Sequence, residues 1–119
     1  METVTLFGPV GPKELALIEA AGFKAFPPRL LTQPIFYPVC NVEYAIFIAR
    51  EWNVRDSGSG FVTQFEVALE FISRYERQIV GSRVHEEYWI PAEELDEFNS
   101  NIVGEIQVTH RFGLEQGSA

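Results

Sequence analysis

Three prolines, Pro27, Pro28 and Pro34, interrupt the stretch from Phe26 to Pro34. Proline lacks a backbone N–H, and its ring clashes with the preceding turn of a helix, so this stretch cannot be helical. We expect it to run over the surface of the molecule or to wrap the rim of a cleft. Regular structure is therefore left to the segments before and after it.

Those segments carry the patterns of short strands and short helices. Apolar alternation and β-rich runs predict strands over residues 4–7, 35–37, 61–67, 78–80, 84–90 and 102–112. Helical spacing predicts helices over 12–21, 42–52 and 92–98; Asn41 is a good N-cap for the second, and Pro91 starts the third. Residues 69–75 fit either a short helix or a strand. Short strands mixed with three helices predict an α+β domain.

A chain of 119 residues with 46% hydrophobic content is the size of one domain and can bury a core of its own. We expect a single domain over 1–119, with its core between residues 4 and 112 and a frayed end over 113–119. Trp52, Phe65, Tyr88 and Phe98 are expected to include several of the most buried side chains.

Hydropathy, charge and cysteine content also limit the compartments and the binding partners expected for the protein. No apolar run approaches the roughly 20 residues that cross a bilayer, and the N-terminus does not resemble a secretory signal. A soluble, cytoplasmic protein is therefore expected, and the single cysteine fits a reducing compartment. The net charge of −8 disfavours binding to nucleic acid or to anionic membranes.

Few residues suit metal or nucleophilic chemistry. His85, His110 and Cys40 are too few and too scattered for a recognisable zinc pattern, so no metal site is predicted. Cys40 precedes a predicted helix, whose dipole could lower the pKa of the thiol. The alternative, which we favour, is a buried and inert cysteine.

The segment from His85 to Pro91 offers the most chemistry. Successive side chains of a strand point to opposite faces. If Tyr88 and Ile90 face the core, Glu86 shares their side; if Trp89 is buried instead, His85 and Glu87 share its face. A carboxylate lining a cleft there could act as a base or stabilise a cation. The competing interpretation is a solvated face of an edge strand.

In chain order, three segments resemble the motifs of the ADP-ribosyltransferase-like fold, especially small bacterial proteins labelled ADP-ribosylation or crystallin-like. Residues 5–8, Thr-Leu-Phe-Gly, are similar to the first motif. Residues 35–41, Ile-Phe-Tyr-Pro-Val-Cys-Asn, lead into a helix and are similar to the second. Residues 87–91, Glu-Tyr-Trp-Ile-Pro, are similar to the third. The resemblance spans residues 4–112.

The resemblance implies an ADP-ribosyltransferase-like fold of short, mainly antiparallel strands in a split sheet. It also implies NAD as substrate, with ADP-ribose transferred to an unknown acceptor or nicotinamide released. Glu87 takes the catalytic position, where it would stabilise the cationic ribose, and His85 lies two residues before it, at the position that guides the acceptor. Arg29, Tyr37 and Phe36 are the candidates for binding the cofactor.

Two of the motifs depart from the family's pattern. The Arg or His of the first strand would fall near Gly8, and the Ser-Thr-Ser positions read Pro38-Val39-Cys40. The alternative is therefore a catalytically inactive binding module of the same fold, such as an adaptor, an immunity-type protein or a ligand sensor. A small structural or stress protein without a site is a third possibility.

Overall fold

The three longest strands form one antiparallel sheet in the order β1-β3-β7. The computed structural model describes residues 1–81 and 85–113. In it β1 spans Thr3–Val10, β3 spans Gly60–Ala68 and β7 spans Ile102–Phe112. The predicted strands 4–7, 61–67 and 102–112 are therefore confirmed. Two irregularities in the pairing of β3 with β7 explain why the apolar residues of β7 do not alternate strictly.

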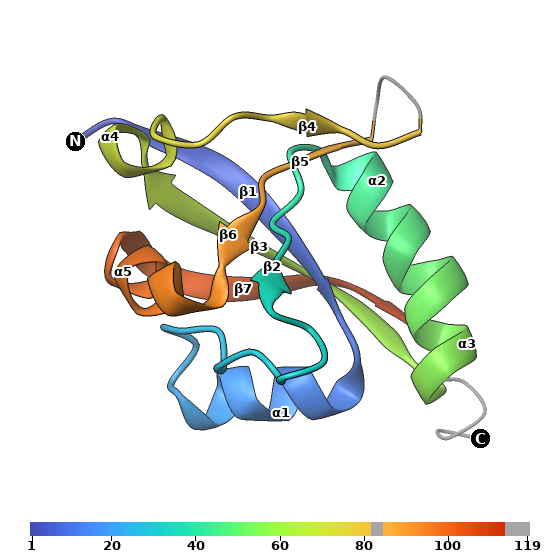
Figure 1. The fold of residues 1–119 in the computed structure, drawn as a ribbon. Coiled ribbons are helices and arrows are strands. Elements are labelled where there is room, and N and C mark those ends of the chain that lie inside the picture. The colour runs from blue at the N-terminus through green and yellow to red at the C-terminus, as the bar shows by residue number, and fades with distance from the viewer. Residues whose placement is uncertain (82–84, 114–119) are drawn as a thin grey trace.

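One long helix in Figure 1 contains three segments, α2, η1 and α3, which follow one another without a break. Asn41 caps its start, because its side chain accepts a hydrogen bond of 2.8 Å from the amide of Tyr44. The middle segment is a π-helix, and the helix ends at Gly58, whose φ of 87° is left-handed. The bounds are α2 Val42–Phe47, η1 Ile48–Asn53 and α3 Val54–Ser57.

The remaining helices lie where the patterns placed them. The first is α1, Pro12–Ala20. Residues 92–98 begin as the 3-10 helix η2, Ala92–Glu94, and continue as α5, Leu95–Ser100. The ambiguous segment after β3 forms the short helix α4, Leu69–Ile72. The predicted helices are confirmed, and the α+β class with them.

Four strands of two residues each form two further ladders. β2 (Ile35–Phe36) pairs with β6 (Ile90–Pro91), and β4 (Gln78–Ile79) pairs with β5 (Glu86–Glu87). A single strand over 84–90 is wrong: β5 ends at Glu87, β6 begins at Ile90, and Val84 lies outside the described residues. After β5 the amide of Tyr88 donates to the carbonyl of Pro38, one of the bonds that form the antiparallel bridge between Val39 and Glu87.

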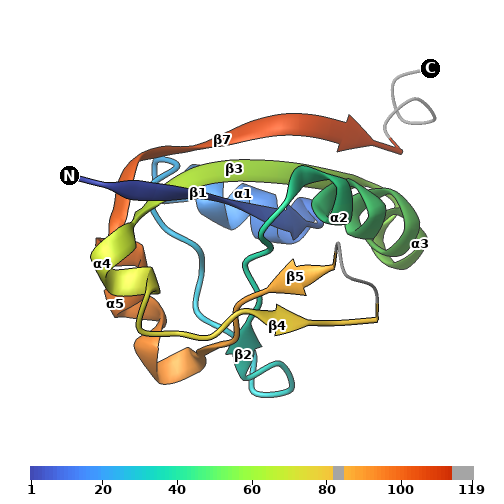
Figure 2. The same ribbon diagram turned by 90° about the horizontal axis from the view of Figure 1, so that it is seen from above.

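One residue joins the short strands to the long sheet. Val39 forms isolated bridges with Phe7 of β1 on one side and with Glu87 of β5 on the other. Figure 2 shows the resulting arrangement, with β7 on one side of the molecule and β2, β4 and β5 on the opposite side.

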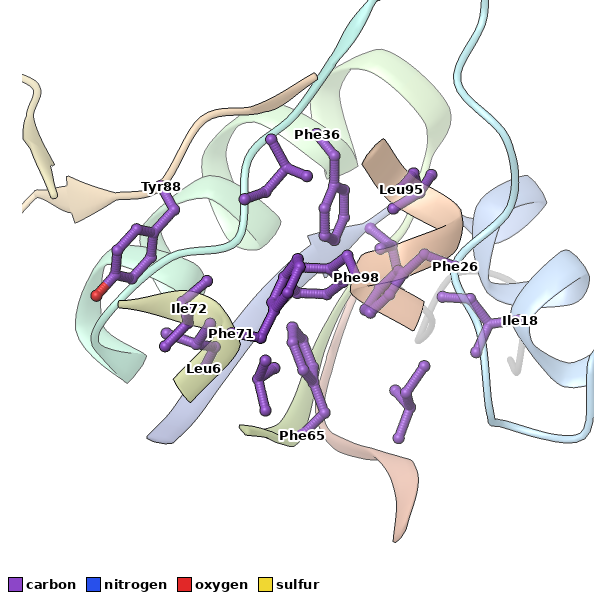
Figure 3. Close-up of a cluster of buried hydrophobic side chains, with 14 of the residues drawn as sticks. Leu6, Ile18, Phe26, Phe36, Phe65, Phe71, Ile72, Tyr88, Leu95 and Phe98 are labelled. Atoms are coloured by element: carbon purple, nitrogen blue, oxygen red, sulfur yellow. The ribbon is translucent and has the colours of Figure 1, made fainter. Parts of the chain in front are cut away.

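Phenylalanine rings fill the core between the long sheet and the segments that cover it (Figure 3). The ring of Phe26 lies 4.7 Å from that of Phe36 and 4.9 Å from that of Phe65. The expected burial of Phe65, Phe98 and Tyr88 is confirmed, because none is more than 5% exposed.

The expected burial of Trp52 is wrong, because this side chain is 50% exposed. The helical pattern assumed α-helical spacing from Ala45 through Trp52. Ala45 and Ala49 are buried as expected, but η1 has i→i+5 hydrogen bonds, which change the face that each later side chain occupies. No helix of the described residues is long and apolar enough to cross a membrane. Of the frayed end expected over 113–119, residues 114–119 lie outside the described part.

Candidate functional site

A pocket of about 820 Å³ opens between β1, the proline-rich segment, the α2–η1 helix and the β4–β5 ladder. This volume is in the range typical of small-molecule sites. Segments far apart in the sequence, from Gly8 to Glu87, line it, which explains why no single motif reveals it. All five residues that the resemblance named line this one pocket: Arg29, Phe36, Tyr37, His85 and Glu87.

Glu87 is 7% exposed, and both oxygens of its carboxylate accept hydrogen bonds. The Tyr44 hydroxyl donates to Oε1 at 2.9 Å, and Trp89 Nε1 donates to Oε2 at 2.7 Å. Burial, with the bond to Glu87 adding to it, raises the pKa of Tyr44 above its usual range, so the phenol stays protonated and keeps donating. Each oxygen retains lone-pair capacity for one more donor. The carboxylate is thus fixed in position at the pocket wall.

His85 lies against the aromatic wall of the same pocket. Its ring stacks on Tyr44, with centroids 4.4 Å apart and planes 8° apart, and also lies 5.6 Å from the ring of Phe47. His85 and Glu87 line the pocket, while Tyr88 and Ile90 are buried in the core. This is the first of the two expected alternations, and Arg77 bonds to both the Tyr88 hydroxyl and the Glu86 carboxylate, which therefore lie on the same side.

Arg29 occupies another part of the lining, and its side chain is 13% exposed. Nη1 lies 3.1 Å from Glu14 Oε2, and the guanidinium lies 5.6 Å from the centre of the Phe36 ring. Nε is buried and has no hydrogen-bond partner among the described residues. Burial raises the pKa of Glu14, and the neighbouring Arg29 opposes that rise.

The two aromatic candidates just after the proline-rich segment, Phe36 and Tyr37, differ in exposure. Phe36 is 4% exposed and belongs mainly to the core, where its ring lies 5.2 Å from that of Phe98. Tyr37 is 47% exposed, so about half of it faces solvent at the pocket.

Sequence reasoning missed several lining residues of the long helix. Tyr44 holds Glu87, and Trp52 and Asn53 come from the π-helix. The buried Oδ1 of Asn53 has no partner among the described residues. The helical pattern treated these positions as part of an amphipathic helix, and no local signal in the sequence marks a π-helix.

Gly8 lines the pocket from β1, at the position where the first motif would carry Arg or His. A Cβ atom there would lie 2.8 Å from Thr63 Oγ1 and 3.2 Å from the ring of Phe26. Thr63 is fully buried, and its hydroxyl donates to the carbonyl of Gly8 at 2.7 Å. The space beside Gly8 is therefore filled, and a side chain at this position requires its neighbours to move.

The structure also bears on the reactivity of Cys40 and on a possible metal site. Burial raises the pKa of the Cys40 thiol to about 11, a rise that the nearby Arg77 only partly offsets, so the suggested lowering by the helix dipole is wrong. Among residues 1–81 and 85–113, no group of three or more His, Cys, Asp or Glu side chains is arranged to hold a metal ion.

Comparisons of this chain with protein-family models, with curated proteins and with solved structures found no match. The pocket must therefore be interpreted from its own geometry.

Proposed function

We propose that the pocket binds NAD and that Glu87 promotes the loss of nicotinamide. On this proposal the chain is an ADP-ribosyltransferase-like domain, in fold and in chemistry, that transfers ADP-ribose to an acceptor or releases nicotinamide. The observation that carries the proposal is the buried Glu87 carboxylate, which Tyr44 and Trp89 hold against the wall of a pocket.

The charge of Glu87 suits the reaction. When the bond between the ribose and nicotinamide breaks, its electron pair leaves with nicotinamide, and positive charge develops on the ribose. A fixed anion beside that charge stabilises the transition state more than the ground state, which is the condition for accelerating a reaction. Because hydrogen bonds already hold Glu87, little reorganisation is required when the charge develops.

The remainder of the lining suits a planar, cationic ring. The nicotinamide of NAD carries a positive charge, and aromatic faces attract cations. Aromatic side chains from three segments line the same pocket as Glu87 and His85: Tyr37, Tyr44, Phe47 and Trp52. The pocket volume of about 820 Å³ is large enough for more than the ring alone.

The second candidate function is a ligand-binding module without catalysis, and Gly8 favours it. At this position β1 contributes no side chain, and Thr63 and Phe26 fill the neighbouring space. NAD would then lack the side chain that the first motif supplies for its orientation. A pocket that binds NAD without this contact would act as a sensor or an adaptor.

The deciding experiment measures nicotinamide release and NAD binding separately, for the wild type and for Glu87→Gln. Glutamine keeps the size of the side chain, can accept from Trp89 and can donate to the Tyr44 hydroxyl, but it carries no charge. We expect nicotinamide release to fall by roughly a hundredfold or more while NAD affinity changes little.

Glu86→Gln is the matched control. Glu86 is the neighbouring carboxylate, its side chain is 30% exposed, and it pairs with Arg77 rather than lining the pocket. This variant should release nicotinamide at the wild-type rate. A wild type that binds NAD and releases no nicotinamide would favour the binding module, and a wild type that does not bind NAD at millimolar concentration would remove NAD from both functions.

A further inference from the structure

Two buried polar atoms of the described residues lack hydrogen-bond partners, Arg29 Nε and Asn53 Oδ1. Both residues line the same pocket. An unpaired buried donor or acceptor is costly, and folded proteins contain few of them. One is a donor and the other an acceptor, so a single ligand with both kinds of group could satisfy them together.

The two residues border the same end of α1. Arg29 pairs with Glu14, which lies in the first turn of that helix. The amide Nδ2 of Asn53 lies 4.0 Å from the position that a Cβ atom would take on Gly11, the residue that caps the helix. Arg29 and Asn53 therefore approach this end of the pocket from the proline-rich segment and from the π-helix.

The chemistry of Arg29 indicates an anionic group. Glu14 engages only Nη1, and Nε belongs to another edge of the planar guanidinium. Such an edge matches two oxygens of a phosphate. Glu14 competes for the same cation, so the arginine is paired but not saturated.

The chemistry of Asn53 indicates a hydroxyl or an N–H of the ligand, because its free atom is an acceptor. The residue lies at the end of η1, and π-helices occur frequently at functional sites. A Cβ atom on Gly60 would lie 2.2 Å from the carbonyl oxygen of Ala49 and 2.8 Å from Cβ of Asn53, so the π-helix is pressed closely against β3. This close packing holds Asn53 in place.

We propose that Arg29 and Asn53 form a subsite for the phosphoribosyl part of a nucleotide ligand. Arg29 donates to a phosphate oxygen, and Asn53 accepts from a ribose hydroxyl. The choice of ligand rests on the proposed function, in which NAD supplies the ADP-ribose group. The subsite itself is distinct from the Glu87 carboxylate at which the bond to nicotinamide breaks.

The test measures the affinity of ADP-ribose by calorimetry, together with the melting temperature of each variant. Asn53→Ala should lower the affinity about tenfold, the value of one lost hydrogen bond, without lowering the melting temperature. The double variant Glu14→Gln with Arg29→Gln removes both charges of the buried pair and should lower the affinity by about tenfold or more.

Glu14→Gln alone should change the affinity for ADP-ribose in the opposite direction. It removes the carboxylate that competes for Arg29, so we expect ADP-ribose to bind severalfold more tightly. Arg74→Gln is the control, because Arg74 pairs with Glu97 at the surface outside the pocket and should not affect the affinity.

Three results would overturn the subsite: no binding of ADP-ribose to the wild type at millimolar concentration, unchanged affinity in Asn53→Ala, or weaker binding in Glu14→Gln. Nicotinamide release tests the proposed function independently of ADP-ribose binding. ADP-ribose binding that depends on both residues without release of nicotinamide supports the subsite and removes the catalysis. Nicotinamide release that substitution of neither residue affects would support the catalysis and remove the subsite.

Discussion

The long sheet and the pocket wall of this molecule are built in opposite ways. The sheet has strands of 8, 9 and 11 residues, while the ladders of the pocket wall have strands of two residues each. Apolar side chains dominate the core beside the sheet, whereas the pocket wall carries a buried carboxylate and two unpaired polar atoms. The comparison indicates that stability comes from the regular region and that the irregular region holds the groups able to do chemistry.

The largest expected loss of stability tests the regular region, the core beside the long sheet. Phe98 is fully buried and contacts the rings of Phe36, Phe65 and Phe71. Phe98→Ala should lower the free energy of unfolding by about 3–5 kcal/mol, measured by urea denaturation. Trp52→Ala, which truncates a larger but half-exposed ring at the pocket, should cost much less. Equal costs for the two variants would abolish the distinction between the regions.

Cys40 tests the boundary between the two regions, since it packs against the core and lies beside the pocket wall. Burial raises the pKa of its thiol from 9.0 to about 11. At pH 8 the thiolate fraction should be about a hundredfold lower than for an ordinary cysteine, and alkylation by iodoacetamide correspondingly slow. Mass spectrometry of the native and urea-unfolded protein provides the measurement. Rapid labelling of the native protein would mean that this boundary opens readily.

Gly60→Ala tests how the π-helix depends on the sheet. The added methyl group would lie 2.2 Å from the carbonyl oxygen of Ala49, so the helix must move away from β3. We expect a loss of about 1–3 kcal/mol in stability, together with weaker binding of any pocket ligand. At Gly11 an added Cβ would have ordinary contacts of 3.5 Å or more, so Gly11→Ala is the milder control. A stable Gly60→Ala with an unaltered pocket would contradict the close packing.

The smallest expected effect is at the carboxylate. Tyr44→Phe keeps the ring that stacks on His85 and removes the hydroxyl that donates to Glu87. We expect a loss of about 1 kcal/mol by thermal denaturation, and a larger relative loss of nicotinamide release because Glu87 is no longer held. Tyr75→Phe, which removes a similar bond to Glu94 away from the pocket, should leave the release unchanged.

The regular region could be predicted from the sequence because its signals are local. Alternation over 61–67 identifies β3, and Asn41 identifies the start of the long helix. The burial of Phe65 and Phe98 follows from these elements. The burial of Trp52 was predicted wrongly because the apolar spacing from Ala45 fits an α-helix, whereas the π-helix turns the later side chains to another face.

The candidate site could be predicted only in part. Each residue of the set named from the sequence lines the pocket, yet Tyr44, Asn53 and Glu14 were missed. Their roles depend on contacts between residues far apart in the chain, such as Tyr44 with Glu87 or Arg29 with Glu14. Whether the pocket performs the proposed reaction stays a prediction.

The bridging position of Val39 has a consequence for how the molecule opens. Its amide and carbonyl bond to Phe7 at 2.8 and 2.9 Å, and the neighbouring amides of Cys40 and Tyr88 continue the ladder toward β5 with one bond each among the described residues. Local unfolding follows such sparsely bonded boundaries, so amide hydrogen exchange should be graded across the molecule. The amides of Cys40 and Tyr88 should exchange through local opening, and those of β3 only when the whole chain unfolds. A ligand that contacts both sides of the pocket would reduce this difference in exchange rate, because it would slow amide exchange on the β5 side alone.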